Sequence, residues 1–356
     1  MKLTAISGFG AKGPACFLFE IEGRRLLLDL GRGPDRDALP DLAGIGPVDA
    51  ILFSHGHADH TGGLHLAAML GDPPLFATRP VIDLAPEGAL KTATPYEDLT
   101  EILGLPFACG PAGHAPGACW MRIGGEAGLL YTGDISRDGS LWRWSAPHPA
   151  AALLFDASYG AADQPLADQI AGVAEFAARP LLLPAPARGR GLEMALAMQA
   201  LGHEVALCPA HRITAGIMIR QPAWLVPGAA DALARLLDTS LPLDETSPAR
   251  GLMIAAGPNA ERGVAAVLGP RFLAEDSAAI VFTGHLAEGQ PSRQWVDEGR
   301  ALFRRWNVHP TLSEARDLFD HVRPDRAMAA FCTPEARRDL QSALGRPLAD
   351  TAEMVW

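Results

Sequence analysis

Three histidines and one aspartate fall within six consecutive positions of this sequence, at the end of a predicted strand over 48–54. The segment reads Ser54-His55-Gly56-His57-Ala58-Asp59-His60. Neutral imidazoles and carboxylates are ligands that Zn²⁺ prefers. Side chains at positions i and i+2 of an extended segment point the same way, so His55 and His57 can hold one ion. Asp59 and His60 follow in the turn and can face a second ion beside the first.

Further candidate ligands stand at similar places in the sequence. His114 lies in Ala112-Gly113-His114-Ala115-Pro116-Gly117, Asp134 ends the run Leu130–Asp134, and Asp29 ends the run Leu26–Asp29. Each is a polar residue at the end of a strand-like run or between glycines. Together with the histidine cluster, these residues complete a candidate dinuclear centre.

The elements that must position these residues are short strands in the first part of the chain. Gly8-Phe9-Gly10-Ala11-Lys12-Gly13 has the spacing of a dinucleotide fingerprint, but that motif must open a helix. Here Pro14 leads into the strand-like run 15–21, so we interpret the glycine segment as a hairpin turn. Strands are predicted at 3–7, 15–21, 25–30, 48–54, 75–78, 128–131 and 153–155, with a helix at 63–70.

The pattern changes after Gly160, where predicted helices and buried strands alternate. This alternation indicates a parallel α/β unit. The last part of the chain returns to two helices around one strand. The predicted elements are helices at 164–178, 192–201, 312–322 and 334–344, and strands at 181–183, 205–207, 278–283 and 326–331.

Composition limits the class of protein. Hydrophobic residues make up 48% of the 356 residues, which is enough for a large core, and the net charge of −11 excludes a non-specific nucleic-acid coat. The five scattered cysteines form no CxxC pair and predict a reducing, cytoplasmic setting. Residues 1–10 contain no apolar h-region, so we expect no secretory signal, and no run reaches the ~18 apolar residues that a membrane span needs. No G-x-S-x-G elbow or P-loop supports a serine hydrolase or an NTPase.

The HxHxDH segment at 55–60, with the later His114 and Asp134 and the early Asp29, resembles the metallo-β-lactamase superfamily. The resemblance implies an αββα sandwich with two metals at one edge. It implies His55, His57 and His114 on metal one, Asp59 and His60 on metal two, Asp134 as the bridge, and Asp29 as a support behind the ligands. A metal-bound hydroxide would then be the nucleophile.

The second half is similar to the β-CASP nucleases of this superfamily. The similar segments are Phe155–Gly160, Pro184-Ala185 with Arg188–Glu193, Thr283–Gly289, and Val308-His309-Pro310 with the helix that follows. The resemblance implies residues 1–158 as the first part of the metallo-β-lactamase domain, 159–300 as an inserted α/β cassette, and 301–356 as the return. It also implies a functional His309, which protonates the leaving 3′-oxygen and is oriented by Asp156.

One departure from the family concerns the second metal. RNA-directed relatives carry a further histidine after the helix at 312–322, where this sequence has Phe331-Cys332. Cys332 is a candidate soft ligand in its place, and a buried hydrophobic role is equally compatible with the sequence. Metal two is therefore expected to be weak, labile or absent.

Three functions remain open from the sequence. The first is a Zn²⁺- or Mn²⁺-dependent phosphodiesterase that cleaves RNA or single-stranded DNA, with Asp59, His309 and Asp156 as catalytic residues. The second is a hydrolase of a small ester, thioester or lactone, which suits the acidic charge. The third is a metal-binding scaffold without catalysis. The sequence does not determine the oligomeric state.

Overall fold

The computed structural model describes the backbone of residues 1–356 and every side chain except that of Glu87. The chain forms two compact units. Unit 1 consists of Met1–Arg137, Trp142–Asp163 and His309–Trp356, and unit 2 consists of Asp138–Leu141 and Gln164–Val308. All the candidate site residues named above therefore belong to unit 1.

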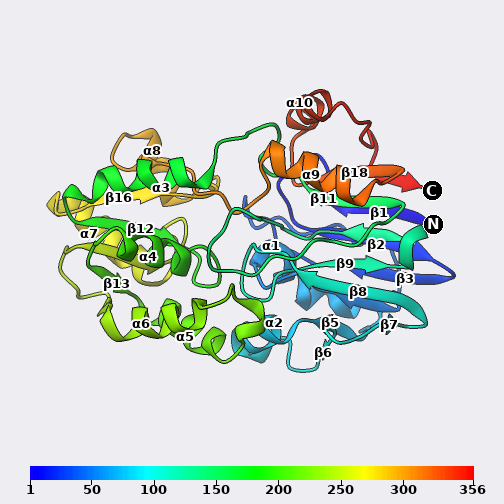
Figure 1. The fold of residues 1–356 in the computed structure, drawn as a ribbon, viewed down its shortest axis with the longest axis horizontal. Helices are drawn as coiled ribbons and strands as arrows, with labels where there is room; N and C mark the ends of the chain where they lie inside the picture. The colour runs from blue at the N-terminus through cyan, green and yellow to red at the C-terminus, as the bar shows by residue number, and fades with distance from the viewer. The chain divides into compact units, whose positions relative to one another are not determined.

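Unit 1 is built from two mixed sheets (Figure 1). The order in sheet 1 is β19 (Glu353–Val355), β1 (Lys2–Ser7), β2 (Cys16–Ile21), β3 (Arg24–Leu28), β4 (Ala50–Leu52), β5 (Leu75–Ala77) and β6 (Thr94–Pro95). The order in sheet 2 is β18 (Arg326–Ala330), β11 (Ala152–Asp156), β10 (Leu129–Tyr131), β9 (Cys119–Ile123), β8 (Leu105–Pro111) and β7 (Glu101–Ile102). Because β19 pairs with β1, the two ends of the chain lie side by side.

Alternation along β2 explains how sheet 1 packs on both faces. Successive side chains of a strand point to opposite sides. The ring of Phe17 lies 5.7 Å from that of Tyr131 in sheet 2, between the two sheets. Cys16 and Leu18 point the other way, into a hydrophobic cluster with the 3₁₀ helix η1 (Leu64–Leu70) and helix α2 (Arg79–Asp83).

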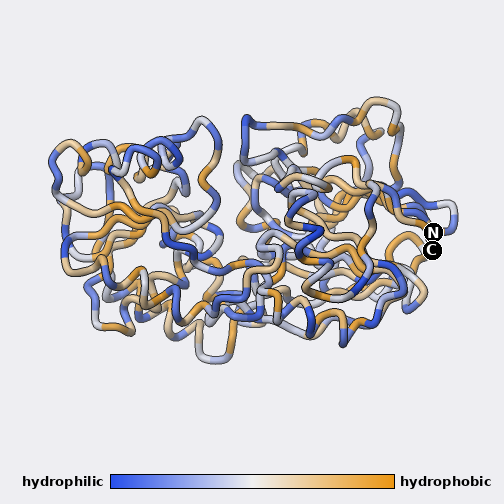
Figure 2. Tube along the Cα trace, turned by 90° about the horizontal axis from the view of Figure 1, so that it is seen from above, coloured by the Kyte–Doolittle hydropathy of each residue, from blue (hydrophilic) through white to orange (hydrophobic). Residues whose placement is uncertain are grey.

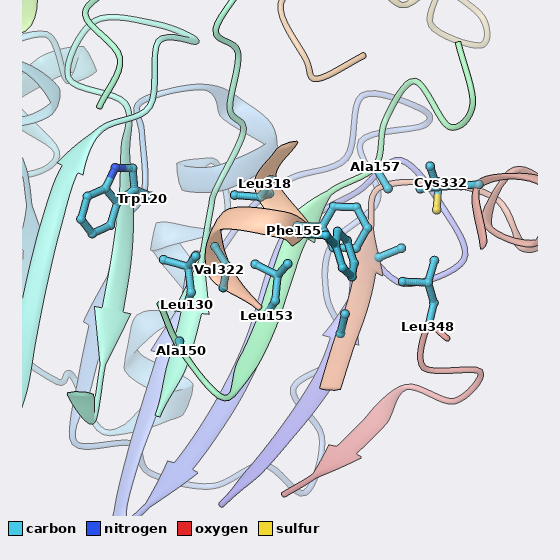
Figure 3. Close-up of a cluster of buried hydrophobic side chains, with 14 of the residues drawn as sticks. Trp120, Leu130, Ala150, Leu153, Phe155, Ala157, Leu318, Val322, Cys332 and Leu348 are labelled. Atoms are coloured by element: carbon cyan, nitrogen blue, oxygen red, sulfur yellow. The ribbon is translucent and has the colours of Figure 1, made fainter. Parts of the chain in front are cut away.

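Helices α9 (Leu312–Val322) and α10 (Pro334–Leu344) cover sheet 2 (Figure 3). Phe319 and Val322 of α9 pack in one cluster with Leu153 and Phe155 of β11. Thr311 starts α9 through a capping box with Glu314, in which each side chain accepts a backbone N–H of the other residue. The observed bounds of both helices are those that the sequence predicts.

The glycine segment before β2 is a hairpin turn, as the sequence indicates. Strands β1 and β2 pair antiparallel across it, with Leu3 opposite Phe19. Two expectations need correction. The strand predicted at 48–54 is shorter, because the regular strand β4 spans only Ala50–Leu52. The helix predicted at 63–70 is a 3₁₀ helix that ends at Gly71, in the left-handed conformation at φ 86°.

Unit 2 contains a parallel sheet with helices between its strands. In Figure 2 its hydrophobic stretches run through the middle, where the strands lie. The strand order is β14 (Leu241–Pro242), β13 (Val205–Leu207), β15 (Leu252–Ala256), β12 (Leu181–Ala185), β16 (Ala279–Phe282) and β17 (Leu302–Phe303). The helices are α3 (Leu166–Ala174), α4 (Gly191–Ala200), α5 (Pro209–Ile219), α6 (Ala229–Thr239), α7 (Gly263–Glu275) and α8 (Pro291–Asp297).

All five cysteines are free thiols. Four of them are buried, and Cys109 is half-buried. In the part of the chain that the structure describes, no helix has the length and hydrophobicity needed to cross a membrane.

Phe155→Ala is expected to lower the free energy of unfolding by about 3–5 kcal/mol, because it leaves a cavity in a fully buried cluster. The ring of Phe155 meets that of Phe319 edge to face at 5.2 Å. Urea denaturation followed by circular dichroism measures the change. The control is Leu39→Ala at a side chain that is 44% exposed, which should change stability by less than about 0.5 kcal/mol. Equal effects of the two substitutions would contradict this packing.

Candidate metal centre

The candidate ligands gather because several strands of unit 1 deliver them at their carboxyl ends. Strands β3 and β4 are parallel neighbours in sheet 1, and β10 and β11 are parallel neighbours in sheet 2. Asp29 follows β3, and the histidine segment follows β4 and enters α1 (Ala58–Thr61). Asp134 follows β10, and Asp156 is the last residue of β11. His114 comes from the loop after β8, so distant parts of the sequence meet here.

Three ring nitrogens converge in the first group. His55 Nε2 lies 3.1 Å from His57 Nδ1, and His114 Nε2 lies 3.1 Å from the same His57 atom. One ligand atom from each of the three residues lies within 4.8 Å of the others. Neutral imidazoles that point their nitrogens at one place form a typical Zn²⁺ donor set. These are the three residues expected on metal one.

A second group contains His55, His60 and Asp134. His60 Nε2 is 3.2 Å from Asp134 Oδ1, and His55 Nε2 is 3.9 Å from Asp134 Oδ2. Asp134 is 3% exposed, and its Oδ1 faces His60 Nε2 but accepts no hydrogen bond of normal geometry from the described residues. A buried carboxylate oxygen without a donor is costly unless a cation binds it. The residues present therefore fit a metal ion at this place, with Asp134 shared between the groups.

Asp29 lies behind this cluster and is completely buried. Its Oδ1 accepts the backbone N–H of Ser54 at 2.7 Å. Its Oδ2 accepts the hydroxyls of Ser54 at 2.7 Å and Tyr131 at 2.6 Å, and lies 2.7 Å from His60 Nδ1. The contact with Nδ1 leaves Nε2 of His60 directed at Asp134. Asp29 thus orients a candidate ligand, as partners of metal-bound histidines commonly do.

The electrostatics of the cluster depend on the two carboxylates that flank His60. Burial alone would lower the pKa of His60, but Asp134 and Asp29 together raise it well above its usual value. Burial lowers the pKa of His55 well below its usual value, and the neighbouring His60 and His57 lower it further. Burial opposes the ionisation of Asp134, but His60 and His309 hold its pKa well below the usual range. Asp134 is therefore a carboxylate in this cluster, and a carboxylate is the form that binds metal.

His309 and Asp156 meet beside the cluster. His309 Nδ1 lies 2.7 Å from Asp156 Oδ2, and both residues are buried. Asp156 is fixed in turn by the backbone N–H groups of Ser158 and Ile135, at 3.0 and 3.3 Å. His309 also joins His114 and Asp134 in a third group of potential ligands, with its Nδ1 3.6 Å from Asp134 Oδ2. The 152 residues between Asp156 and His309 contain nearly all of unit 2.

Asp59 stands apart from these groups. It is half-buried on the short helix α1, and its β-carbon lies 3.7 Å from where a side chain at Gly13 would begin. Among the described residues, the three groups of potential ligands contain His60 where the sequence predicts Asp59 and His60 together. The geometry therefore assigns the second group to His55, His60 and Asp134.

Of the two roles left open for Cys332, its surroundings favour the buried hydrophobic one. Cys332 packs with Phe155, Leu340 and Leu348 in the cluster that covers the outer face of sheet 2 (Figure 3). Burial raises the pKa of its thiol to about 11, so the thiolate needed for metal binding is disfavoured. The residue before it, Phe331, meets the ring of His60 edge to face at 5.3 Å. Phe331 has a φ of 63°, and this left-handed turn directs the two neighbouring side chains to opposite places.

Sequence reasoning missed the residues that hold Asp29 and border His60. Ser54 and Tyr131 both donate to Asp29. Ser54 is adjacent to the histidine segment and Tyr131 is three residues before Asp134, so proximity in sequence is a weak signal for both. Nothing in the sequence indicates that Phe331 lies against His60.

Comparison with known proteins agrees with this site. Residues 10–171 match the family described as the Metallo-beta-lactamase superfamily. The chain is 27% identical over 300 residues to transcription termination factor FttA of Cenarchaeum symbiosum, which covers 70% of this chain and 46% of that protein. It is 30% identical over 226 residues to Ribonuclease TTHA0252 of Thermus thermophilus, which covers 52% of each chain.

A third relative is Endoribonuclease YSH1 of Kluyveromyces lactis, 24% identical over 251 residues, which covers 55% of this chain and 32% of that protein. The aligned regions span about half the length of FttA and of Ribonuclease TTHA0252, and less of YSH1. A solved structure of a protein of unknown function from Enterococcus faecalis has the same fold, with a TM-score of 0.60 at 13% identity. That match covers 100% of this chain and 99% of the other.

Asp29→Asn is expected to weaken metal binding by about 10–100-fold, because the amide cannot replace all the hydrogen bonds that orient His60. Competition with a chromogenic zinc chelator measures the affinity. The matched control is Tyr131→Phe, which removes one donor to Asp29 and should have a smaller effect. Unchanged affinity in Asp29→Asn would show that this carboxylate does not position the ligands.

Cys332→Ala is expected to leave the zinc content unchanged, because the thiol lies in a hydrophobic cluster. Elemental analysis after gel filtration measures the metal per chain. The comparison variant, His114→Ala, removes a nitrogen from the first group and should lose metal. Loss of zinc in Cys332→Ala, with the fold intact, would make Cys332 a ligand.

Proposed function

We propose that this chain, whose residues 10–171 match the metallo-β-lactamase superfamily, is a metal-dependent phosphodiesterase that cleaves RNA or single-stranded DNA. The observation that carries the proposal is the His309–Asp156 pair, 2.7 Å apart, beside the cluster of histidines and Asp134. Hydrolysis of a phosphodiester needs a nucleophile and a proton for the leaving oxygen, and this arrangement offers a group for each. The names of the relatives add support, because two of them are described as ribonucleases.

The ligand set suits zinc at the first group and a second, weaker ion at the other. His55, His57 and His114 would hold the first ion, and His60 with Asp134 would hold the second. Zn²⁺ supplies a nucleophilic water at neutral pH and stabilises negative charge on phosphoryl oxygens. Mn²⁺ is an alternative occupant. Asp59 is proposed as a further ligand of the second ion, reached by rotation of its half-buried side chain.

His309 is proposed as the general acid. Its Nδ1 donates to Asp156, which leaves Nε2 as the nitrogen that exchanges a proton with the leaving 3′-oxygen. Asp156 is held by two backbone N–H groups, so it keeps the orientation of the imidazole. Such a positioned acid contributes about 10²–10⁴-fold to the rate of hydrolysis.

Residues 159–300 are proposed as a β-CASP-like cassette, inserted between Asp156 and His309. The parallel α/β architecture of unit 2 over Gln164–Val308 supports this reading. Relatives that share the aligned region are nucleases by name. We therefore propose a nucleic-acid strand, rather than a small ester, as the substrate.

His309→Ala is expected to slow cleavage of an end-labelled oligonucleotide by about 10²–10⁴-fold, because the leaving oxygen then departs unprotonated. A substrate with sulfur in place of the bridging 3′-oxygen has a leaving group that needs no proton. Cleavage of this thio substrate should be nearly the same in His309→Ala and the wild type. Rates on both substrates, with Zn²⁺ or Mn²⁺ and with a chelator as blank, measure the effect.

Asp134→Ala is the matched control, since it removes the shared ligand and should abolish cleavage of both substrates. If His309→Ala is equally slow on both substrates, His309 is not the acid. If the metal-loaded wild type cleaves neither RNA nor DNA, the phosphodiesterase proposal is wrong. Turnover of a small ester, thioester or lactone would then indicate the alternative hydrolase, and no turnover would leave a scaffold.

A further inference from the structure

A pocket of about 290 Å³ opens in unit 1 between helix α9 and the loop that follows Asp134. Helix α9 contributes Glu314, Asp317, Leu318 and His321, which form one face because they are spaced by three or four residues. The loop contributes Trp144 opposite them. The metal and acid–base residues described above do not line this pocket, which adjoins them along the chain.

The pocket is held open by contacts at both ends. At one end the backbone N–H of Arg137 donates to Glu314 at 2.9 Å, and the Arg137 guanidinium pairs with Asp317. At the other end, His321 Nε2 lies 2.8 Å from the carbonyl oxygen of Pro147. Because both ends of the loop are fastened to α9, the space between them is preformed and needs no rearrangement to accept a ligand.

The walls suit a flat molecule with hydrogen-bond donors. Trp144 presents a half-buried indole, with the Arg137 guanidinium 5.7 Å from the ring centroid, and Leu318 adds an apolar surface. Ser136 also lines the pocket. It is 3% exposed, and its hydroxyl has no hydrogen-bond partner among the described residues. A buried hydroxyl without a partner is costly unless a ligand pairs with it.

The charge of the rim disfavours phosphate. The lining contains three carboxylates, those of Glu314, Asp317 and Asp320, and two basic side chains, those of Arg137 and His321. Arg137 pairs with Asp317, and Arg346 pairs with Asp320 at 2.9 Å. These pairs compensate most of the negative charge of the rim but do not make the rim positive. A phosphodiester would be repelled, whereas an uncharged ring with amino donors is favoured by carboxylate acceptors. The part of a nucleotide with these properties is its base.

The position along the chain supports this occupant. Pro310 lines the pocket and is bonded to His309, and Ser136 is two residues after Asp134. Consecutive Cα atoms are about 3.8 Å apart, so the pocket wall begins within about 8 Å of both site residues. This is about the span of one nucleotide. A strand with a phosphate at the metal ligands could place a neighbouring base beside Trp144.

We propose that this pocket binds a base next to the scissile phosphate, with Trp144 as the stacking surface and a preference for bases that carry an exocyclic amino group. The inference rests on the proposed phosphodiesterase function. Stacking of a base on an aromatic side chain contributes about 1–3 kcal/mol, or about 5- to 150-fold in affinity. Adenine, cytosine and guanine would then be favoured over uracil and thymine at that one position.

The test is a scan of oligonucleotides, each with one abasic site at a different distance from the cleavage point. For the metal-loaded wild type, one position should lower kcat/KM by about 5- to 150-fold. Trp144→Ala should lower kcat/KM on the intact strand by a similar factor and abolish the penalty at that position, since the two losses remove one contact. Trp144→Phe should restore most of the effect, and Trp224→Ala, at a half-buried indole in unit 2, should leave the scan unchanged.

Two results would overturn the inference while cleavage itself persists. One is an abasic penalty of the same size in the wild type and Trp144→Ala. The other is a wild type that is insensitive to abasic sites but binds an arginine-rich peptide, with that binding lost in Trp144→Ala. The second result would assign the pocket to a cationic side chain of a partner protein. Absence of any cleavage by the wild type would instead remove the proposed function on which the inference rests.

Discussion

The buried carboxylate of Asp29 is the constraint on which the site depends. A charge that is fully removed from water must be surrounded by donors, and Asp29 finds them on both sheets of unit 1. Ser54 donates from the segment after β4, and Tyr131 donates from β10. The same carboxylate contacts His60 Nδ1. One hydrogen-bonded group therefore joins the two sheets and aims a candidate ligand at Asp134.

The rest of the site follows from strand direction. Parallel neighbours end at the same edge, so β3 with β4 and β10 with β11 bring Asp29, the histidine segment, Asp134 and Asp156 together. Asp156 then fixes His309, which lies 153 residues later in the chain. The groups that each histidine contacts distinguish the histidines suited to metal binding from the one suited to proton transfer. Histidines with nitrogens that face one another suit a cation, whereas His309, held by a carboxylate, suits proton transfer.

The sequence predicts the parts of this arrangement that depend on local patterns. The histidine segment can be predicted because its candidate ligands lie within six positions of one another. The start of α9 can be predicted because Thr311 and Glu314 form a local capping box. The conformation at Phe331 is different. Its left-handed backbone directs Phe331 to His60 and leaves Cys332 among hydrophobic side chains, and no short-range pattern indicates that turn. The pocket beside Trp144 cannot be predicted from local patterns either, because its two walls are about 170 residues apart in sequence.

Anomalous X-ray diffraction from zinc-loaded crystals, recorded at the zinc absorption edge, shows whether this edge of unit 1 is a metal centre. We expect a strong peak among His55, His57 and His114, and a weaker one among His55, His60 and Asp134. Zinc bound by other residues, or no peak at this place in protein whose zinc content has been verified, would show that these residues do not form a metal centre.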